Sequence, residues 1–154
     1  ESYPVIVHAL KEMESFTEKE YDYVVMLQPT TPLRTSGDID EALGLLIESG
    51  ADSVVSVVEV GGNHPLRMKR IVGDNHLVNY IEQDFENMKP RQELPPVYIR
   101  NGAIYASKRS VMVDGGALVG GDCRAYVMPQ ELSVNIDTTL DFFLAEAILQ
   151  HKHE

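Results

Sequence analysis

The sequence has few cysteines, an excess of acidic over basic residues, and no long uninterrupted apolar run. Its single cysteine, Cys123, cannot form an internal disulfide, and no signal-like segment or apolar run of membrane length is present. We therefore expect a protein of the reducing cytoplasm that has no membrane partner. The net charge is −11, from 13 basic and 24 acidic residues. Since proteins that bind phosphate backbones present basic surfaces, we expect no nucleic-acid partner.

Two kinds of catalytic site are also excluded. The five histidines are scattered or lie in the C-terminal tail, and neither cysteine nor carboxylate residues accompany them at zinc-binding spacing. Cys123 has no histidine or asparagine pairing that would mark it as a nucleophile, so we interpret it as a bystander thiol. We expect neither a zinc site nor a cysteine nucleophile.

The chain has the composition of one globular domain, with 44% hydrophobic and 24% charged residues among 154. A helical apolar pattern near the N-terminus precedes a strand at 22–28, a helix around residues 39–47 and a strand at 53–58. Asp38 with Glu41 is expected to cap the second helix and Gly50 to end it. The strand, helix, strand unit predicts an α/β fold with a right-handed parallel connection.

The second half begins with an excursion at 61–99. Strands are predicted at 66–71 and 77–81, joined by a Gly- and Asn-containing turn, so this segment resembles an insertion with its own hairpin. A strand at 97–106 follows, and a glycine within a strand often marks a bulge or a close approach to a ligand.

A flexible loop at 115–122 precedes a short strand at 124–128 and a terminal helix that includes Leu140. If Asp137 has no binding role, the alternative is that Asp137 or Thr138 simply caps that helix, with Asp141 in its first turn.

The most informative stretch is 24–34, Val-Val-Met-Leu-Gln-Pro-Thr-Thr-Pro-Leu-Arg. A buried strand runs into polar residues held between two prolines, which fix the backbone. Gln28, Thr30, Thr31 and Arg34 should emerge at the carboxyl end of that strand, where α/β sheets bind their ligands. An ordinary strand end stiffened by proline is the alternative.

Three segments together resemble the acylneuraminate cytidylyltransferase family, the CMP-N-acetylneuraminic acid synthetases. They are the 24–34 stretch, residues 90–105 with Arg-Gln and then Asn-Gly-Ala-Ile-Tyr, and residues 133–141 with Asn-Ile-Asp-Thr. The order and spacing of the three match that family from about residue 20 onward. The resemblance implies that side chains from these distant stretches converge around one cleft.

The fold implied by the resemblance is a three-layer, Rossmann-like nucleotidyltransferase fold. Its hairpin arm, here 61–99, would form a homodimer. The family's N-terminal triphosphate-binding loop has no counterpart in residues 1–20. We therefore expect residues 1–154 to be a single partial domain, incomplete at its N-terminus and inactive alone.

The implied reaction transfers CMP from CTP to the anomeric hydroxyl of a nonulosonic, sialic-type acid and releases pyrophosphate, with Mg²⁺ as cofactor. Catalysis would consist mainly of positioning both substrates and supplying the metal. The resemblance assigns the metal to Asp137, as catalytic ligand, and to the residue two positions earlier, which can reach the same ion. That residue is Asn135 instead of the family's aspartate. An amide oxygen brings no negative charge, so metal affinity should fall.

The resemblance also assigns sugar-acid contacts to Gln28, Asn101 and Tyr105. Arg67 and Arg91, in the projecting segment, would reach a carboxylate in the neighbouring subunit, since a guanidinium donates two parallel hydrogen bonds. Surface ion pairs for the arginines and a core position for Tyr105 are the alternatives.

One departure concerns the sugar. Leu118 and Val119 stand where the sialic acid enzymes present aromatic residues to the acyl group, so the identity of the accepted acid stays open. Two other functions stay open: a noncatalytic dimeric sugar-acid-binding module, which Asn135 favours, and a 3-deoxy-manno-octulosonate cytidylyltransferase.

Overall fold

The computed structural model describes residues 2–82 and 89–151, without the side chain of Arg91. It divides into two compact units. The first comprises Glu1–Val58 with Arg100–Glu154, and the second is Glu59–Ile99. The second unit nearly coincides with the excursion predicted at 61–99.

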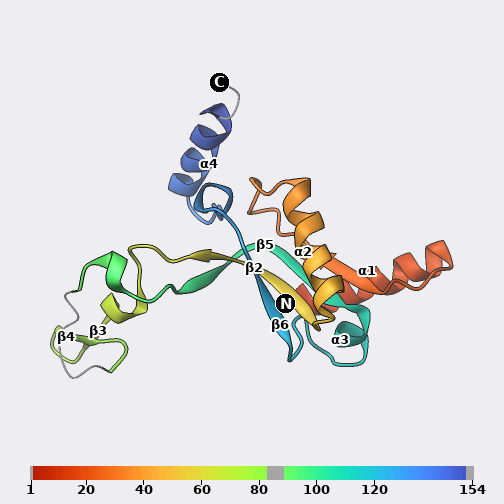
Figure 1. Cartoon of the computed structure of the whole chain (residues 1–154), viewed down its shortest axis with the longest axis horizontal. Helices are drawn as coiled ribbons and strands as arrows, with labels where there is room; N and C mark the ends of the chain where they lie inside the picture. Colours follow the sequence, from red (N-terminus) through yellow and green to blue (C-terminus); the bar gives the residue numbers. More distant parts are fainter. Residues whose placement is uncertain (1, 83–88, 152–154) are drawn as a thin grey trace. The chain divides into compact units, whose positions relative to one another are not determined.

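A mixed four-stranded sheet forms the centre of the first unit (Figure 1). Its strands are β1 (Tyr23–Met26), β2 (Ser53–Glu59), β5 (Tyr98–Lys108) and β6 (Cys123–Val127), in the order β1-β5-β2-β6. β1 pairs antiparallel with β5, and β2 pairs parallel with β6. The α/β class is confirmed, and β5 lies between the two strands of the predicted strand, helix, strand unit.

The helix α2 (Ser36–Ser49) begins at a reciprocal cap that the sequence analysis misplaced. Thr35 is the N-cap, its hydroxyl accepts from the Asp38 backbone N–H, and the Asp38 carboxylate accepts from the Thr35 backbone N–H at 2.7 Å. Asp38 is therefore the third helical residue, and the predicted Asp38–Glu41 cap was wrong by one turn. Gly50 ends the helix in the left-handed conformation, as expected.

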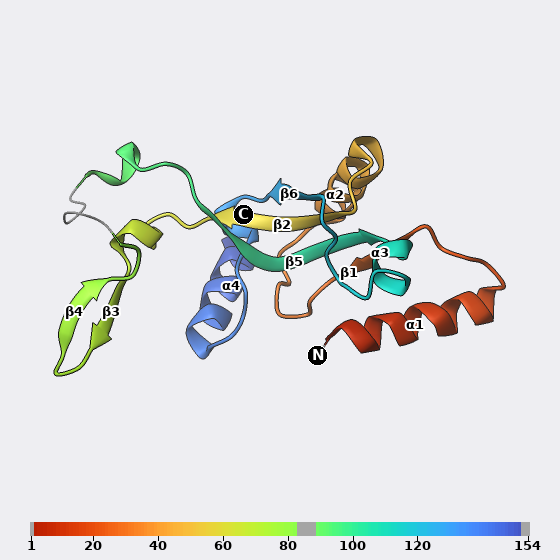
Figure 2. The same cartoon turned by 90° about the horizontal axis from the view of Figure 1, so that it is seen from below.

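The core joins α2 to the sheet. Ala42 and Leu46 of α2 are fully buried against a cluster that includes Val54 and Ile104, each also fully buried. Ala103 and Ala106 of β5 belong to the same buried cluster. Figure 2 shows α2 on one side of the sheet and α1 on the other, which agrees with the layered arrangement expected for this class.

The N-terminal helix α1 (Ser2–Thr17) is attached by polar contacts to α3 (Arg109–Val113), a short helix that the sequence analysis missed. Arg109 Nε donates to Glu14 Oε1 at 2.7 Å, and Tyr3 Oη donates to the Met112 carbonyl at 2.6 Å. α3 has five residues, too few for a helical apolar period to appear in the sequence.

Replacing Glu14 with Gln is expected to remove a pH-dependent contribution to stability. The Arg109 hydrogen bond holds the pKa of Glu14 below its ordinary value of 4.5. A carboxylate with a lowered folded pKa stabilises the protein above its unfolded pKa, and this stabilisation is lost as pH falls through the folded pKa. Melting temperatures measured from pH 7 to pH 3 should show wild type above Glu14→Gln at neutral pH, with the two converging in acid.

Glu12→Gln, which alters an exposed carboxylate on the same helix, is the control. It should leave the melting temperature at pH 7 unchanged. A constant offset between wild type and Glu14→Gln at every pH would contradict the assignment.

The second unit contains a two-stranded hairpin and two 3₁₀ turns. β3 (Lys69–Val72) pairs antiparallel with β4 (His76–Asn79), which confirms the predicted hairpin and its turn. The first strand starts later than predicted because Pro65–Arg67 form the turn η1, with proline at its start. The other turn is η2 (Arg91–Glu93).

A buried histidine links the two ends of this unit. His64 Nδ1 accepts from the Leu66 backbone N–H at 3.1 Å, so Nε2 carries the proton and donates to the Pro95 carbonyl at 3.0 Å.

No helix among the described residues combines the length and apolar character needed to cross a membrane.

Candidate functional site

The polar loop after β1 is folded by one arginine. Arg34 Nη1 donates to the Gln28 carbonyl at 2.7 Å, to the Thr31 carbonyl at 2.6 Å and to the Thr31 hydroxyl at 3.0 Å. Thr31 is fully buried. The loop is therefore a closed structure at the carboxyl end of β1, as expected of a segment held between Pro29 and Pro32.

The Gln28 side chain lies against the kink in β5. Gly102 has φ +77°, and a Cβ at that position would collide with Gln28 Oε1. Thr31 Oγ1 also donates to the Gly102 carbonyl at 3.3 Å. The glycine that the sequence marked as a close approach is needed both for its backbone conformation and for the space that Gln28 occupies.

The buried Asn101 side chain joins several segments by hydrogen bonds. It is 5% exposed, its Oδ1 accepts from the Ser56 hydroxyl at 2.6 Å and from the Ala103 N–H at 3.2 Å, and its Nδ2 donates to Ser133 Oγ at 2.9 Å. A further contact joins Nδ2 to Met128 Sδ. The amide thus connects β5 to β2 and to the segment that precedes α4.

The third motif reaches the same place. Ile136 N–H donates to the Thr30 carbonyl at 2.8 Å, which joins the 133–138 segment to the loop after β1. The segments that carry Gln28, Asn101 and Asp137 are therefore hydrogen-bonded to one another although they lie far apart in the sequence.

Tyr105 lies three residues beyond Gly102 on β5, opposite Met26, and is 8% exposed. Ser107, two residues further and on the same face of the strand, donates its hydroxyl to the Leu118 carbonyl at 2.6 Å. The 115–122 loop is thus attached to the face of β5 that carries Tyr105. The low exposure of Tyr105 agrees with the alternative of a core position for its ring.

The start of α4 (Thr139–His151) is capped by Thr138, one of the two expected caps. Thr138 and Asp141 bond reciprocally: Thr138 N–H and Oγ1 donate to Asp141 Oδ2 at 2.8 Å, and Asp141 N–H donates to Thr138 Oγ1 at 3.3 Å. The hydrogen bond from the Thr138 hydroxyl is the main reason why the pKa of Asp141 is lowered. The Asp137 carboxylate takes no part in this cap.

Asp137 and Asn135 offer the oxygen donors that a hard cation takes. Asn135 Nδ2 donates to Asp137 Oδ2, and Asn135 Oδ1 is a buried atom without a hydrogen-bond partner in the described part of the chain. An exposed carboxylate beside an unpartnered amide oxygen fits Mg²⁺ in donor type. Residues 2–82 and 89–151 contain no cluster of three or more His, Cys, Asp or Glu side chains suited to a metal, so water or substrate oxygens would complete the coordination.

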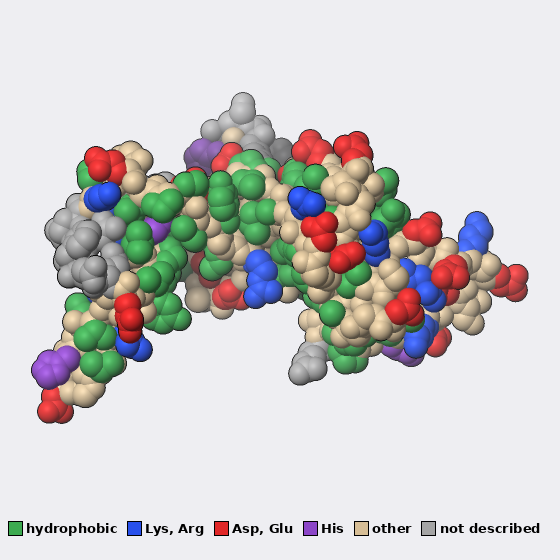
Figure 3. All heavy atoms as spheres, turned by 60° about the horizontal axis from the view of Figure 1, so that its bottom comes forward, with side chains coloured by type: hydrophobic (Ala, Val, Ile, Leu, Met, Phe, Trp, Pro, Cys, Tyr) green, Lys and Arg blue, Asp and Glu red, His purple; other side chains and the backbone are tan. Residues whose placement is uncertain are grey.

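The two arginines predicted for the neighbouring subunit lie in the second unit. Arg67 Nη2 donates to the Lys89 carbonyl at 2.8 Å, and the Arg91 side chain lies outside the described residues. Hydrophobic side chains reach the surface of this unit in the space-filling view (Figure 3). Ile71 and Leu77 of β3 and β4 are 69% and 66% exposed.

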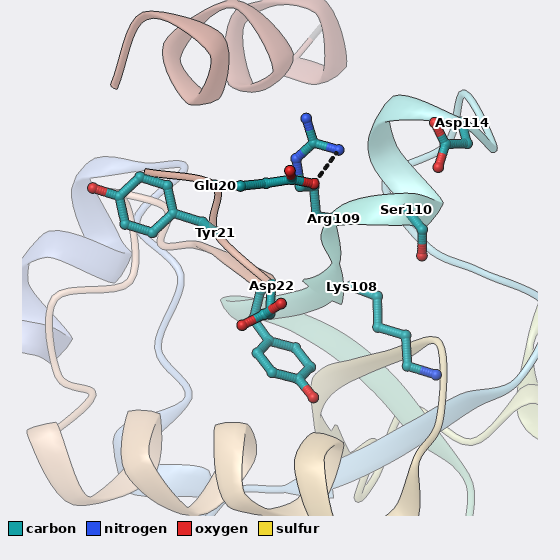
Figure 4. A pocket seen from close by; sticks show the side chains of 8 residues that line it. Glu20, Tyr21, Asp22, Lys108, Arg109, Ser110 and Asp114 are labelled. Carbon is teal, nitrogen blue, oxygen red and sulfur yellow. Dashed lines mark ion pairs between the residues drawn. The ribbon is translucent and has the colours of Figure 1, made fainter. Parts of the chain in front are cut away.

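A separate cavity of about 380 Å³ lies at the other end of β1, where β5 leads into α3 (Figure 4). Acidic and basic side chains face each other across it, and Arg109 Nη1 pairs with Glu20 Oε1 at 3.1 Å. Because Arg109 pairs with Glu20 and also holds α1 through Glu14, we interpret this cavity as a structural junction and not as the substrate site.

Sequence reasoning missed the residues that hold the site together. Ser56 and Ser133 both bond to Asn101, and neither belongs to the motif positions that suggested chemistry. The available signal was a lone serine inside the apolar run Ser53-Val-Val-Ser-Val-Val, because a buried hydroxyl requires a partner.

No family model matches the chain. Among curated proteins, it is 32% identical over 133 residues to an N-acylneuraminate cytidylyltransferase of Streptococcus agalactiae, covering 86% of this chain and 31% of that protein. It is 30% identical over 154 residues to the Escherichia coli O18:K1:H7 protein of the same name, covering 99% and 34%.

A "Post-translational flagellin modification protein B" of Campylobacter coli is 25% identical over 150 residues, with 97% of this chain and 62% of that protein covered. The chain thus spans between about a third and three fifths of the length of these relatives. The identities extend over most of the chain, and the three motifs meet at one end of the sheet. By sequence, the chain is therefore related to the N-acylneuraminate cytidylyltransferases, at 30–32% identity.

Proposed function

We propose that this chain carries the sugar-acid side and the metal side of a cytidylyltransferase site, in which CMP passes from CTP to the anomeric hydroxyl of a nonulosonic acid and pyrophosphate leaves. The observation that carries the proposal is the meeting of Gln28, the Gly102 kink and the Asp137 segment. The names of the relatives, which describe transfer to N-acylneuraminate, support the same substrate class.

Each group has a role that its chemistry allows. The Gln28 amide can donate to and accept from sugar hydroxyl and carboxylate groups, and its Oε1 lies against the backbone of Gly102. Asp137 and Asn135 would hold Mg²⁺, which stabilises negative charge on the phosphoryl oxygens when bound. Tyr105, on the strand that carries the kink, would contact the sugar acid. The chain's main contribution would be to hold the two substrates in reacting geometry.

Calorimetric titration tests the proposal. A panel of nonulosonic acids, 3-deoxy-manno-octulosonate and CTP with Mg²⁺ should be titrated into the chain and into Gln28→Ala. We expect a nonulosonic acid to bind, and the Gln28→Ala variant to bind it at least about tenfold more weakly, as for loss of one or two hydrogen bonds. Absence of binding by every sugar acid and by CTP would overturn the proposal.

A noncatalytic sugar-acid-binding module is the second candidate. Asn135 favours it, since its amide lacks the charge of the family's aspartate and already donates to Asp137. The same titrations separate the two functions: sugar-acid binding without any CTP–Mg²⁺ binding supports the module, and binding of both supports the transferase. Preference for 3-deoxy-manno-octulosonate would instead reassign the substrate.

We also propose that the second unit forms a homodimer through its hairpin, with Arg67 and Arg91 directed to the partner's substrate. Ile71 and Leu77 are directly opposite in the β3–β4 pair, and both are largely exposed. A lone two-stranded hairpin is marginally stable in water, so burying this apolar pair against a second copy would stabilise it.

Replacing Ile71 with Lys is therefore expected to shift the protein from dimer to monomer in light scattering coupled to size exclusion, because a charge would enter an apolar contact. Asp74→Lys, which places a lysine at the exposed hairpin turn instead, should leave the dimer intact. A monomeric wild type at high micromolar concentration would refute the arm's role.

A further inference from the structure

The segment that carries Asp137 is connected to the rest of the site by very few hydrogen bonds. Apart from the bonds of Ser133 to the preceding residues 129 and 130, two hydrogen bonds among the described residues join it to the site before α4 begins: Asn101 Nδ2 to Ser133 Oγ at 2.9 Å, and Ile136 N–H to the Thr30 carbonyl at 2.8 Å. Ser133 Oγ donates in turn to the Pro129 carbonyl at 2.7 Å. One link leads to the interior and the other to the Gln28 loop.

The two links differ in what fixes them. Asn101 is buried and is held by Ser56 and the Ala103 amide, so the position of its Nδ2 is set by the sheet. Thr30 lies in the loop that Arg34 closes, so its carbonyl is set by the same loop that carries Gln28. Asp137 follows Ile136 directly. The position of the Asp137 carboxylate relative to Gln28 therefore depends on the hydrogen bonds that Ser133 and Ile136 make.

A carboxylate positioned in this way depends on its supporting hydrogen bonds. Groups that orient a metal ligand commonly change metal affinity by ten- to a hundredfold when they are removed. A hydroxyl whose removal costs little global stability can thus have a large effect on the ligand that it positions.

We propose that Ser133 is a positioning residue: its hydroxyl, held by the Asn101 amide, fixes the Asn135–Asp137 pair against the Gln28 loop. This inference deepens the proposed function and rests on it where metal binding is concerned. Asn101 would then have a second role besides any contact with the sugar acid: its amide would hold Ser133 and, through Ser133, position Asp137.

The test compares Ser133→Ala with Ser133→Thr and with Ser49→Ala, a control whose hydroxyl donates to the Leu45 carbonyl at the end of α2. Two quantities are measured on the whole chain: hydrogen exchange of the peptide covering 133–138, and Mn²⁺ affinity by titration, with Mn²⁺ as the probe for Mg²⁺. Ser133→Ala should exchange several-fold faster at the Ile136 amide and bind Mn²⁺ about tenfold more weakly. Ser133→Thr, which keeps a hydroxyl, should restore both.

The outcomes distinguish the positioning role of Ser133 from the metal binding that the proposed function assumes. Unchanged exchange and unchanged Mn²⁺ affinity in Ser133→Ala overturn the inference, and so does faster exchange with unchanged affinity. A loss of melting temperature much larger than in Ser49→Ala, with exchange raised throughout the chain, also overturns it, because the role would then be global stability. The wild type could also fail to bind Mn²⁺ while Ser133→Ala still exchanges faster at 133–138. That result supports the positioning role of Ser133 and overturns the metal part of the proposed function.

Discussion

Replacing Gly102 with alanine is expected to displace Gln28 and to weaken sugar-acid binding more than it lowers stability. Gly102 has φ +77°, a conformation that costs a residue with a side chain about 1–2 kcal/mol. The new methyl group would occupy the place of Gln28 Oε1. The end of a glutamine side chain moves at low energetic cost, so the collision changes the site more than it changes the fold.

Thermal unfolding and calorimetric titration with a nonulosonic acid measure the two effects separately. A cost of 1–2 kcal/mol corresponds to a fall in melting temperature of about 3–8 °C for a chain of this size. Gly44→Ala is the matched control: Gly44 lies inside α2 with open space around its Cβ position, so alanine there should stabilise by up to about 1 kcal/mol.

A double-mutant cycle sharpens this prediction. If the kink acts through Gln28, then Gly102→Ala should weaken binding little further in a Gln28→Ala background. Full additivity of the two losses would show that Gly102 affects binding by another route, and unimpaired binding by Gly102→Ala would remove the geometric basis of the site.

Replacing Asn101 with alanine is expected to cost about 3 kcal/mol of folding stability. The change leaves the buried Ala103 N–H without its acceptor, removes a partner from Ser56 and Ser133, and opens a cavity. Loss of a buried hydrogen-bond partner costs about 1–3 kcal/mol, and the cavity adds to it. Denaturant titration should show a lower midpoint with an unchanged slope.

Tyr105→Phe provides the comparison for Asn101. It removes one hydroxyl from a buried ring on the same strand, and it should change stability by less than about 1 kcal/mol. If Tyr105 contacts the sugar acid, its variant loses affinity while remaining stable. An Asn101→Ala variant with wild-type stability would contradict the interior role that its hydrogen bonds indicate.

Much of the fold could be predicted from local patterns. The β3–β4 hairpin follows from its Gly- and Asn-containing turn, and the helix over Ser36–Ser49 follows from its apolar period and terminal Gly50. Boundaries were less certain, because two caps compete at the start of α2. Thr35 and not Asp38 is the N-cap, because this places Asp38 where its carboxylate accepts a hydrogen bond from the Thr35 N–H.

The segments that meet at the candidate site were singled out from the sequence, but the hydrogen bonds that join them were not. Gln28, Asn101 and Asp137 were singled out by motif, and the structure brings their segments together. That Asn101 bonds internally to Ser56 and Ser133 could not be read from the chain, because the partners lie 45 and 32 residues away. Sequence separation conceals such contacts whenever no local pattern accompanies them.

The sequence by itself determined the secondary structure class, the acidic character, and the polar residues that follow β1, because hydrophobic period, charge and proline placement act over a few neighbouring residues. Only the tertiary structure decided that β5 separates β1 from β2, that Gly102 makes room for Gln28, and that Asp137 is tied to Thr30 through Ile136. The physical reason is that strand order and long-range hydrogen bonds depend on how distant segments bury their apolar faces together.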